Sequence, residues 1–312
     1  QMPATGGNVN AINALLTING DGQSDTLNVD DTGDVNGNNG QLTATTLTGL
    51  GMAQGIVYGT VEALNIDLGS GGDTFAIEGT HGGTTVLNSN GGGDTVNLLS
   101  NAGVTTVNSG TGADTVNILS NGAETTVNGG DDGDTINVRA INALATINAG
   151  AGSDTVNVGS LAPAVGGNVN AISAVLIING DGESDTLNVD DTGDSAPNTL
   201  NLTGTTITGL GMSVGITYGS TEFLNIGLGS GGNQVNIQST SASTSVNTGG
   251  GNDFIVVGSL APNLGGTLNS IDGPLTLDGQ GGVDILYADD SGDTLPNTGT
   301  LTATTLTGLG MA

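Results

Sequence analysis

The chain repeats a phrase of about twenty residues, and this period limits its fold more than any other feature. A glycine-rich turn, one aspartate and a short alternating run recur as NSNGGGDTVNL, NSGTGADTVNI, NGGDDGDTINV and NAGAGSDTVNV. The aspartates Asp94, Asp114, Asp134 and Asp154 follow one another at intervals of 20 residues, and Asp73 lies 21 residues before the first. A fixed period of this length is typical of stacked repeats, in which each unit contacts only its neighbours.

Within one repeat, apolar and polar residues alternate as they do in a β-strand. Val156 and Val158 share one face of the run after Asp154, and Thr155 and Asn157 share the other. Glycine, asparagine and threonine at this density oppose helix. The apolar side chains of one coil are too few to form a core unless coils stack at about 4.8 Å per layer. We therefore predict an all-β fold without helices: a parallel β-solenoid with coils of about 20 residues and longer inserted loops.

A larger unit also recurs, because GGNVNAI begins at Gly6 and again at Gly166, and GGTLNSI begins at Gly265. We expect one continuous rod with a first long unit, a second shorter unit and the truncated start of a third, at residues 1–165, 166–264 and 265–312. The 48-residue interval that follows Asp25 is interpreted as about two coils plus a protruding acidic loop. The inserts LAPAVGGNVNAI and LAPNLGGTLNSI are expected to interrupt the outline of the rod without forming domains.

The charge balance excludes several classes of partner. The 312 residues include 30 acidic side chains against a single arginine, which gives a formal net charge of −29. Such a chain lacks the basic side chains that nucleic acids and anionic membranes require, and its apolar runs are too short to insert across a membrane. The absence of cysteine excludes disulfides and cysteine-ligated zinc. One histidine and one arginine leave few acid–base pairs, so we expect no enzyme. Metal cations are the partners that this charge favours.

The turns GSGGDTFAI, GTGADTVNI and GAGSDTVNV resemble the G-G-x-G-x-D-x-U-x nonapeptide of repeats-in-toxin proteins. The resemblance implies calcium held between neighbouring coils by backbone carbonyls and by Asp73, Asp114 and Asp154, with Asp94 and Asp134 in less regular turns. This chain has one such turn in about 20 residues where that family has two in about 18, so a calcium ladder would occupy one edge only. The phrase LNVDDTGD, with the LTATTLTGLGM that follows it, also resembles segments of very large, repetitive bacterial surface proteins.

Electrostatics favours the same ion. Carboxylates stacked about 5 Å apart repel one another by on the order of 1 kcal/mol per pair in water, and almost no basic side chain is present to offset this. Calcium prefers oxygen ligands in flexible loops. The alternative is that each aspartate only closes an Asx-type turn before a strand.

A denser acidic cluster recurs as DDTGD at residues 30–34 and 190–194 and as DDSGD at residues 289–293. It lacks the closing glutamate of an EF-hand loop, and both a calcium site and an ordinary acidic surface loop remain open interpretations. The candidate calcium ligands of the whole chain are Asp25, Asp30, Asp31, Asp34, Asp73, Asp94, Asp114, Asp134, Asp154, Asp185, Asp190, Asp191, Asp194, Asp253, Asp284, Asp289, Asp290 and Asp293.

A Thr-x-Asn pattern recurs on the polar face of four consecutive repeats. It comprises Thr95/Asn97, Thr115/Asn117, Thr135/Asn137 and Thr155/Asn157. The array resembles the ice-binding faces of solenoid antifreeze proteins. The alternative is that threonine suits strands and that stacked asparagines form amide ladders, which stabilise any solenoid.

We therefore expect a structural rod segment of an extracellular or cell-surface bacterial fibre, adhesin stalk or matrix protein, stiffened by Ca²⁺. A ligand-binding face, for example for ice, is the alternative function. Both ends of the sequence match its interior: QMPATGGNVN resembles LAPAVGGNVN, and LTATTLTGLGMA repeats residues 42–53. Because an uncapped coil offers unpaired backbone groups to its neighbours, we expect end-to-end association with further copies, by covalent continuation or by stacking.

Overall fold

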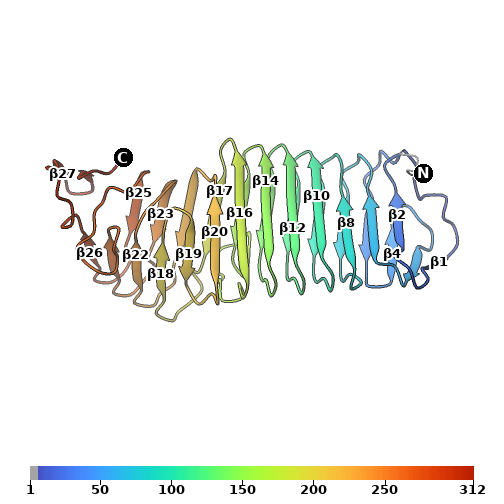
Figure 1. The fold of residues 1–312 in the computed structure, drawn as a ribbon, viewed down its shortest axis with the longest axis horizontal. Coiled ribbons are helices and arrows are strands. Elements are labelled where there is room, and N and C mark those ends of the chain that lie inside the picture. Colours follow the sequence, from blue (N-terminus) through green and yellow to red (C-terminus); the bar gives the residue numbers. More distant parts are fainter. Residues whose placement is uncertain (1–5) are drawn as a thin grey trace.

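A computed structural model describes residues 6–312 and shows a rod made of two long β-sheets (Figure 1). No helix occurs in this range, and the chain passes back and forth between the two sheets, so that one strand from each makes a coil. The two termini lie at opposite ends of the rod, and the strands between them follow roughly in chain order. The prediction of a parallel β-solenoid without helices is confirmed.

Each long sheet contains thirteen strands, and the two are called sheet 1 and sheet 2. Sheet 1 has the spatial order β1 (Leu16–Asn19), β5 (Ile56–Gly59), β4 (Thr46–Gly49), β3 (Asn39–Leu42), β7 (Thr74–Ile77), β9 (Thr95–Leu98), β11 (Thr115–Ile118), β13 (Thr135–Val138), β15 (Thr155–Val158), β17 (Thr186–Asp190), β21 (Phe223–Gly227), β23 (Ser243–Asn247) and β25 (Leu275–Asp278). Sheet 2 has the order β2 (Thr26–Asp30), β6 (Ala63–Asp67), β8 (Thr84–Asn88), β10 (Thr105–Thr111), β12 (Thr125–Asp131), β14 (Ala145–Ala151), β16 (Val175–Gly182), β20 (Gly215–Gly219), β19 (Thr206–Gly209), β18 (Thr199–Leu202), β22 (Gln234–Ile237), β24 (Phe254–Val257) and β26 (Ile285–Ala288). A separate hairpin joins β27 (Gly299–Leu301) to β28 (Leu306–Gly308).

Parallel pairing places residues one period apart side by side. β11 pairs with β13 so that Val116 lies beside Ile136 and Asn117 lies beside Asn137. Val116 and Ile136 are buried between the two sheets, and Asn117, one residue along the strand, points to the opposite face. The core is therefore a stack of thin apolar layers, and each layer covers the next.

Glycine allows the turns to stack as closely as the strands. Gly110, Gly130 and Gly150 have φ angles between 105° and 111°. A Cβ atom added at any of the three would lie 2.0 to 2.2 Å from a carbonyl oxygen of the preceding coil. Both the backbone conformation and the close approach exclude larger residues at these positions.

The 48-residue intervals differ from their prediction. Instead of ordinary coils beside a protruding loop, β3, β4 and β5 form an antiparallel meander inside sheet 1, and β18, β19 and β20 form one inside sheet 2. The first turn is tight because Thr43 and Thr46 exchange hydrogen bonds, with the Thr43 N–H donating to Thr46 O at 2.8 Å. A short turn of this kind can join only antiparallel strands. The solenoid is thus parallel except at these meanders and at the β27–β28 hairpin.

Successive units present equivalent segments on opposite sheets. β1, β16 and β25 begin the three units, and they lie in sheet 1, sheet 2 and sheet 1 respectively. Each passage of the chain from one sheet to the other adds half a coil. Because the first strands of successive units lie in different sheets, the chain makes an odd number of such passages from one unit to the next. We call the turns from sheet 2 to sheet 1 edge I and the turns from sheet 1 to sheet 2 edge II. Equivalent loops alternate between these edges, while both sheets run through the unit boundaries without interruption.

Candidate functional site

The stacked aspartates form columns that are joined by hydrogen bonds along the edges of the rod. Each aspartate lies in the turn just before a strand, and its Oδ1 accepts a hydrogen bond from the backbone N–H of the equivalent residue one coil earlier. In edge I, for example, the Asp94 N–H donates to Asp114 Oδ1 at 2.7 Å, and the Asp114 N–H donates to Asp134 Oδ1 at 2.8 Å. The same bond links Asp73, Asp154 and Asp185 into this column. The sequence period thus brings these candidate ligands together, one per coil.

The column does not stay at one edge, contrary to the expectation for a calcium ladder. After Asp185 the equivalent residues lie in edge II, where the Asn233 N–H donates to Asp253 Oδ1 at 2.7 Å and the Asp253 N–H donates to Asp284 Oδ1 at 3.0 Å. The change of edge arises within the second unit, because the chain crosses between the sheets an odd number of times from the turn of Asp185 to the turn of Asn233. Asp25, at the start of the first unit, also lies in edge II, between β1 and β2.

Two glutamates that sequence reasoning missed continue the columns beyond Asp25 and Asp185. The Asp25 N–H donates to Glu62 Oε2, and the Asp185 N–H donates to Glu222 Oε2, both at 2.8 Å. The signal was present in the sequence, because both glutamates follow a Tyr-Gly pair at the same spacing, in YGTVE and YGSTE. These turns lack the glycine-rich loop, and the longer side chain of glutamate allows its carboxylate to reach the backbone N–H of the aspartate.

The second carboxylate oxygen of the column has no hydrogen-bond partner within the described residues. This holds for the buried Oδ2 atoms of Asp73, Asp94, Asp114, Asp134, Asp154, Asp185 and Asp253. Burial, with repulsion from neighbouring carboxylates, raises the pKa of Asp94 and Asp134 to about 7 and the pKa of Asp114 and Asp185 to about 6. A carboxyl of this kind is stable either in its protonated form or beside a cation.

Asn233 shows what faces these oxygen atoms. This asparagine takes the place of an aspartate, and its Nδ2 donates to the carbonyl oxygens of Thr248 at 2.9 Å and Gly229 at 3.2 Å. The same crowding occurs in an aspartate coil, since a Cβ added at Gly129 would lie 1.9 Å from Ala149 O and 2.5 Å from Asp134 Oδ2. At Asn233 and at Asp134, carbonyl oxygens therefore lie on the inner side of the column, where they suit a donor group or a cation.

The oxygen atoms of the column are of the type that calcium prefers as ligands, but they are few. Carboxylate and carbonyl oxygens are the ligands of calcium, which takes about six to eight of them. Within residues 6–312 no group of three or more acidic or histidine side chains converges in a way that could hold a metal ion. Calcium at the column therefore stays a prediction, with one carboxylate oxygen and backbone carbonyls as the ligands that the column offers.

The DDTGD loops use their carboxylates in a different way. Asp34 accepts hydrogen bonds from the Nδ2 atoms of Asn10 at 2.8 Å and Asn38 at 3.0 Å and from the Asn36 N–H at 2.9 Å. These bonds hold the pKa of Asp34 well below its usual range. Asp31 Oδ1 accepts from the Val9 N–H at 3.0 Å. The loop thus binds the start of its own unit, around residues 7–10, to the rod.

The loops of the other two units repeat these contacts. Asn170 and Asn269 donate to Asp194 and Asp293 at 3.1 and 3.0 Å, as Asn10 does to Asp34. Hydrogen bonds lower the pKa of Asp30, Asp194, Asp289 and Asp293, whereas burial raises the pKa of Asp31 and raises that of Asp191 to about 6. The remaining members, Asp190 and Asp290, each accept a backbone N–H from the same segment of their unit. Calcium in these loops also stays a prediction.

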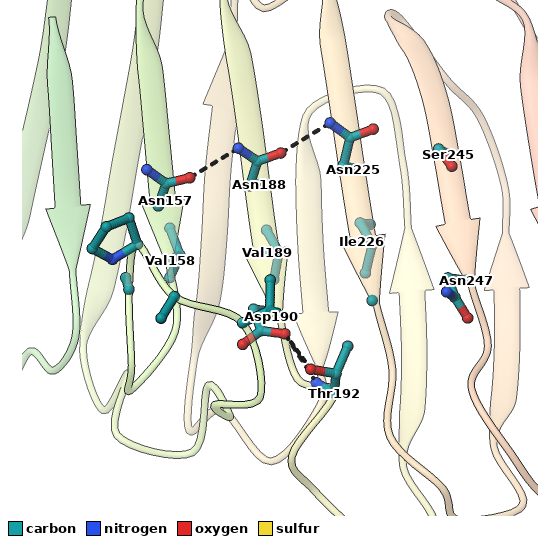
Figure 2. Close-up of a pocket in the computed structure, with 15 residues that line it drawn as sticks. Asn157, Val158, Asn188, Val189, Asp190, Thr192, Asn225, Ile226, Ser245 and Asn247 are labelled. Atoms are coloured by element: carbon teal, nitrogen blue, oxygen red, sulfur yellow. Dashed lines mark hydrogen bonds between the residues drawn. The ribbon is translucent and has the colours of Figure 1, made fainter.

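Outward-facing asparagines form continuous amide ladders on both sheets. Asn188 Nδ2 donates to Asn157 Oδ1, and Asn225 Nδ2 donates to Asn188 Oδ1, both at 2.9 Å (Figure 2). On sheet 1 the ladder extends back to Asn97 through Asn117 and Asn137. A second ladder on sheet 2 comprises Asn88, Asn108, Asn128, Asn148 and Asn179. The sequence prediction included only the first array.

A groove of about 390 Å³ lies beside the sheet 1 ladder (Figure 2). Pro163, Ala164 and Val165 of the first insert form one wall, and Asp190 is the one titratable residue in its lining. The Asp190 carboxylate already accepts hydrogen bonds from Thr192 and from the Gly167 N–H. The groove therefore brings no pair of acid–base groups together.

Comparison with known proteins gives one distant structural match and no sequence match. No family model and no curated protein sequence matches the chain. One solved structure matches: a hyperactive, Ca²⁺-dependent, β-helical antifreeze protein from an Antarctic bacterium, with 17% sequence identity and a TM-score of 0.35. The match covers 91% of this chain and 86% of that one. At this similarity it supports no argument about fold or function. Among residues 6–312, no helix is long and apolar enough to cross a membrane.

Proposed function

We propose that the chain is a structural rod segment of an extracellular or cell-surface bacterial fibre, adhesin stalk or matrix protein. The observation that carries the proposal is the continuity of bonding along the axis. Two sheets of thirteen strands join each coil to the next, and the aspartate columns and two amide ladders add further hydrogen bonds along much of the rod. At each boundary between coils, axial load is thus shared by several hydrogen bonds that act in parallel.

Force spectroscopy on a single molecule, held near its two ends, tests this function. We expect resistance at forces well above those that extend an unstructured chain. Replacing Asn117 and Asn137 by alanine removes rungs of one ladder, and the loss of each rung should cost about 0.5–1.5 kcal/mol and lower the unfolding force. Asn263→Ala is the matched control, since this exposed side chain makes no hydrogen bond in the described structure. Extension without a force peak would contradict a load-bearing role.

Calcium stiffening is a second, separable part of the proposal. The buried Oδ2 atoms of the column support it, because they lack hydrogen-bond partners, and a carbonyl oxygen lies near the one at Asp134. A cation there would neutralise stacked charges that no lysine and only one arginine can offset. The rod itself does not depend on this part.

Ice binding is the candidate function from a different class. Threonines and asparagines pair in register on sheet 1, where Thr115 lies beside Thr135 and Asn117 beside Asn137. Replacing Thr115 and Thr135 by tyrosine should abolish thermal hysteresis while leaving the circular dichroism spectrum unchanged. If the unmodified protein shows no hysteresis, the amide ladders are structural only.

A further inference from the structure

The groove beside the first insert crosses four adjacent strands on the outer face of sheet 1. Its volume of about 390 Å³ is in the range of small-molecule sites in proteins. The floor consists of residues from β15, β17, β21 and β23, which are consecutive in the sheet, so it is about 14 Å long at about 4.8 Å per strand. β17 lies near the middle of the rod (Figure 1), and complete coils are present on both sides of it.

The amide ladder of sheet 1 ends inside this groove and leaves hydrogen-bonding groups free. Asn188 Oδ1 accepts from the Nδ2 of Asn225 in the following coil at 2.9 Å. In the coil after that, Ser245 lies beside Asn225 where the ladder would need another asparagine. Within the described residues, neither Asn225 Oδ1 nor the Ser245 hydroxyl makes a hydrogen bond, and the dashed lines of Figure 2 stop at Asn225. A free acceptor and a free hydroxyl therefore lie on neighbouring strands.

A glycine frees a third group in the same groove. In the first unit, Asp67 Oδ1 accepts a hydrogen bond from Asn88 Nδ2 at 2.6 Å. The equivalent pair in the second unit is Gly227 and Asn247, because β21 pairs with β23 as β6 pairs with β8. Asn247 Oδ1 accepts from the Gly249 N–H at 3.0 Å, but in the described part of the chain its Nδ2 has no acceptor. Glycine thus leaves an amide donor free and removes a carboxylate from the floor.

The rest of the lining restricts the class of ligand. Pro163 and Val165 give one wall an apolar surface, and Val165 is 80% exposed. The lining contains no basic and no aromatic side chain, and the net charge of −29 would repel an anion. The carboxylate of Asp190 already accepts hydrogen bonds. A peptide strand cannot add to the floor, because the backbone of β21 is paired on both sides.

We infer that this groove binds neutral sugar residues, either of a free oligosaccharide or within a polysaccharide chain. Sugar hydroxyls both donate and accept hydrogen bonds, so they would donate to Asn225 Oδ1, accept from Asn247 Nδ2 and do either with Ser245. The C–H face of a sugar ring would cover the apolar wall at Pro163 and Val165. The length of the floor suits a short run of linked rings. The rod would then attach to neutral glycans along its side, which is a function beyond bearing load.

Saturation-transfer NMR on the full chain tests the inference with four neutral probes: maltotetraose, cellotetraose, laminaritetraose and mannotetraose. At least one should receive saturation from the protein and show saturable binding. Affinity electrophoresis in a gel that contains the corresponding soluble polysaccharide then separates the two sources. Retardation of the protein would show that sugars within a chain bind, and binding of the tetrasaccharide without retardation would place a free oligosaccharide in the groove.

Gly227→Asp is the decisive variant, because it restores the residue of the first unit. The new carboxylate should accept the Asn247 amide, as Asp67 accepts the Asn88 amide, and should weaken sugar binding at least about tenfold. A Cβ added at Gly227 would meet only the methyl group of Thr192, at 2.7 Å, so the fold should be retained, as circular dichroism can verify.

Gly219→Asp is the matched control. It adds the same charge at the end of β20 in sheet 2, where a Cβ would have no atom within 4 Å, and it should leave sugar binding unchanged. Asn247→Ala removes the free donor without adding charge and should also weaken binding.

Three results would overturn the inference. The first is that none of the four probes binds to the folded chain. The second is that Gly227→Asp binds as tightly as the unmodified protein. The third is that Gly219→Asp weakens binding as much as Gly227→Asp, because net charge and not the groove would then be the cause. Resistance to force and calcium binding are measured without sugar, so failure of this inference is distinguishable from failure of the rod proposal.

Discussion

The column aspartates and the last aspartate of the DDTGD loops are the same side chain in opposite electrostatic states. In the column, Asp134 has one oxygen bonded to a backbone N–H and one buried oxygen without a partner, and burial raises its pKa to about 7. In the loop, Asp34 accepts bonds from three asparagines, and its pKa is lowered. The difference shows that burial of a carboxylate, weighed against the number of hydrogen-bond donors around it, decides which protonation state the fold favours.

The largest expected effect of this difference is on the pH dependence of stability. Because the folded-state pKa values of the column aspartates are raised, their contribution is fully present below about pH 4, the pKa of an exposed aspartate. It is lost as pH rises through 6 to 7, the values for Asp94, Asp114 and Asp134. In chelator, the melting temperature should therefore fall between pH 5 and pH 8. Calorimetry across this range measures it.

Calcium should reverse this trend if the column binds it. A bound cation favours the ionised carboxylates, so calcium should raise the melting temperature more at pH 8 than at pH 5. Identical melting curves with calcium and with chelator at pH 8 would contradict calcium binding. A melting temperature that does not change from pH 5 to pH 8 in chelator would contradict the raised pKa values.

A single exchange within the column should have the next largest effect. Asn233→Asp removes two amide hydrogen bonds and buries a carboxylate, which should cost about 1–3 kcal/mol at pH 8. The reverse exchange, Asp134→Asn, supplies an amide donor and should stabilise the rod at pH 8. Urea denaturation of both variants at pH 5 and pH 8 measures the changes. Equal effects at the two pH values would show that charge is not the cause.

The smallest effect is expected in the loop, where the change should remain local. Asp34→Ala removes the acceptor of Asn10, Asn36 and Asn38, so hydrogen exchange should accelerate in residues 7–12 while the melting temperature changes little. Because the folded-state pKa of Asp34 is lowered, its stabilising contact is present above about pH 4 and is lost in more acidic solution. The wild-type segment should loosen in the same way below that pH. If hydrogen exchange of the Asp34→Ala variant accelerated throughout the rod at neutral pH, Asp34 would stabilise the whole fold and not only this segment.

Much of the fold followed from the sequence because the relevant contacts lie one period apart. Val116 and Ile136 occupy equivalent positions of neighbouring repeats, and parallel pairing brings such positions together in every coil. The alternation of Val156 and Asn157 likewise determined which face is buried. The column of aspartates follows from the same period.

Two kinds of feature were decided only by the tertiary structure. The first depends on how many times the chain passes between the sheets, and the second depends on contacts with residues far away in the sequence. Whether Asp185 and Asn233 lie at the same edge depends on how often the chain passes between the sheets, a quantity that no local pattern contains. The fold-back of β4 replaced a predicted coil because a tight turn in one sheet reverses the strand. Likewise, the residues that flank an aspartate in a repeated turn do not reveal whether its second carboxylate oxygen will lie beside carbonyl oxygens or beside amide donors. The atoms that decide its charge come from other coils, and only packing places them beside it.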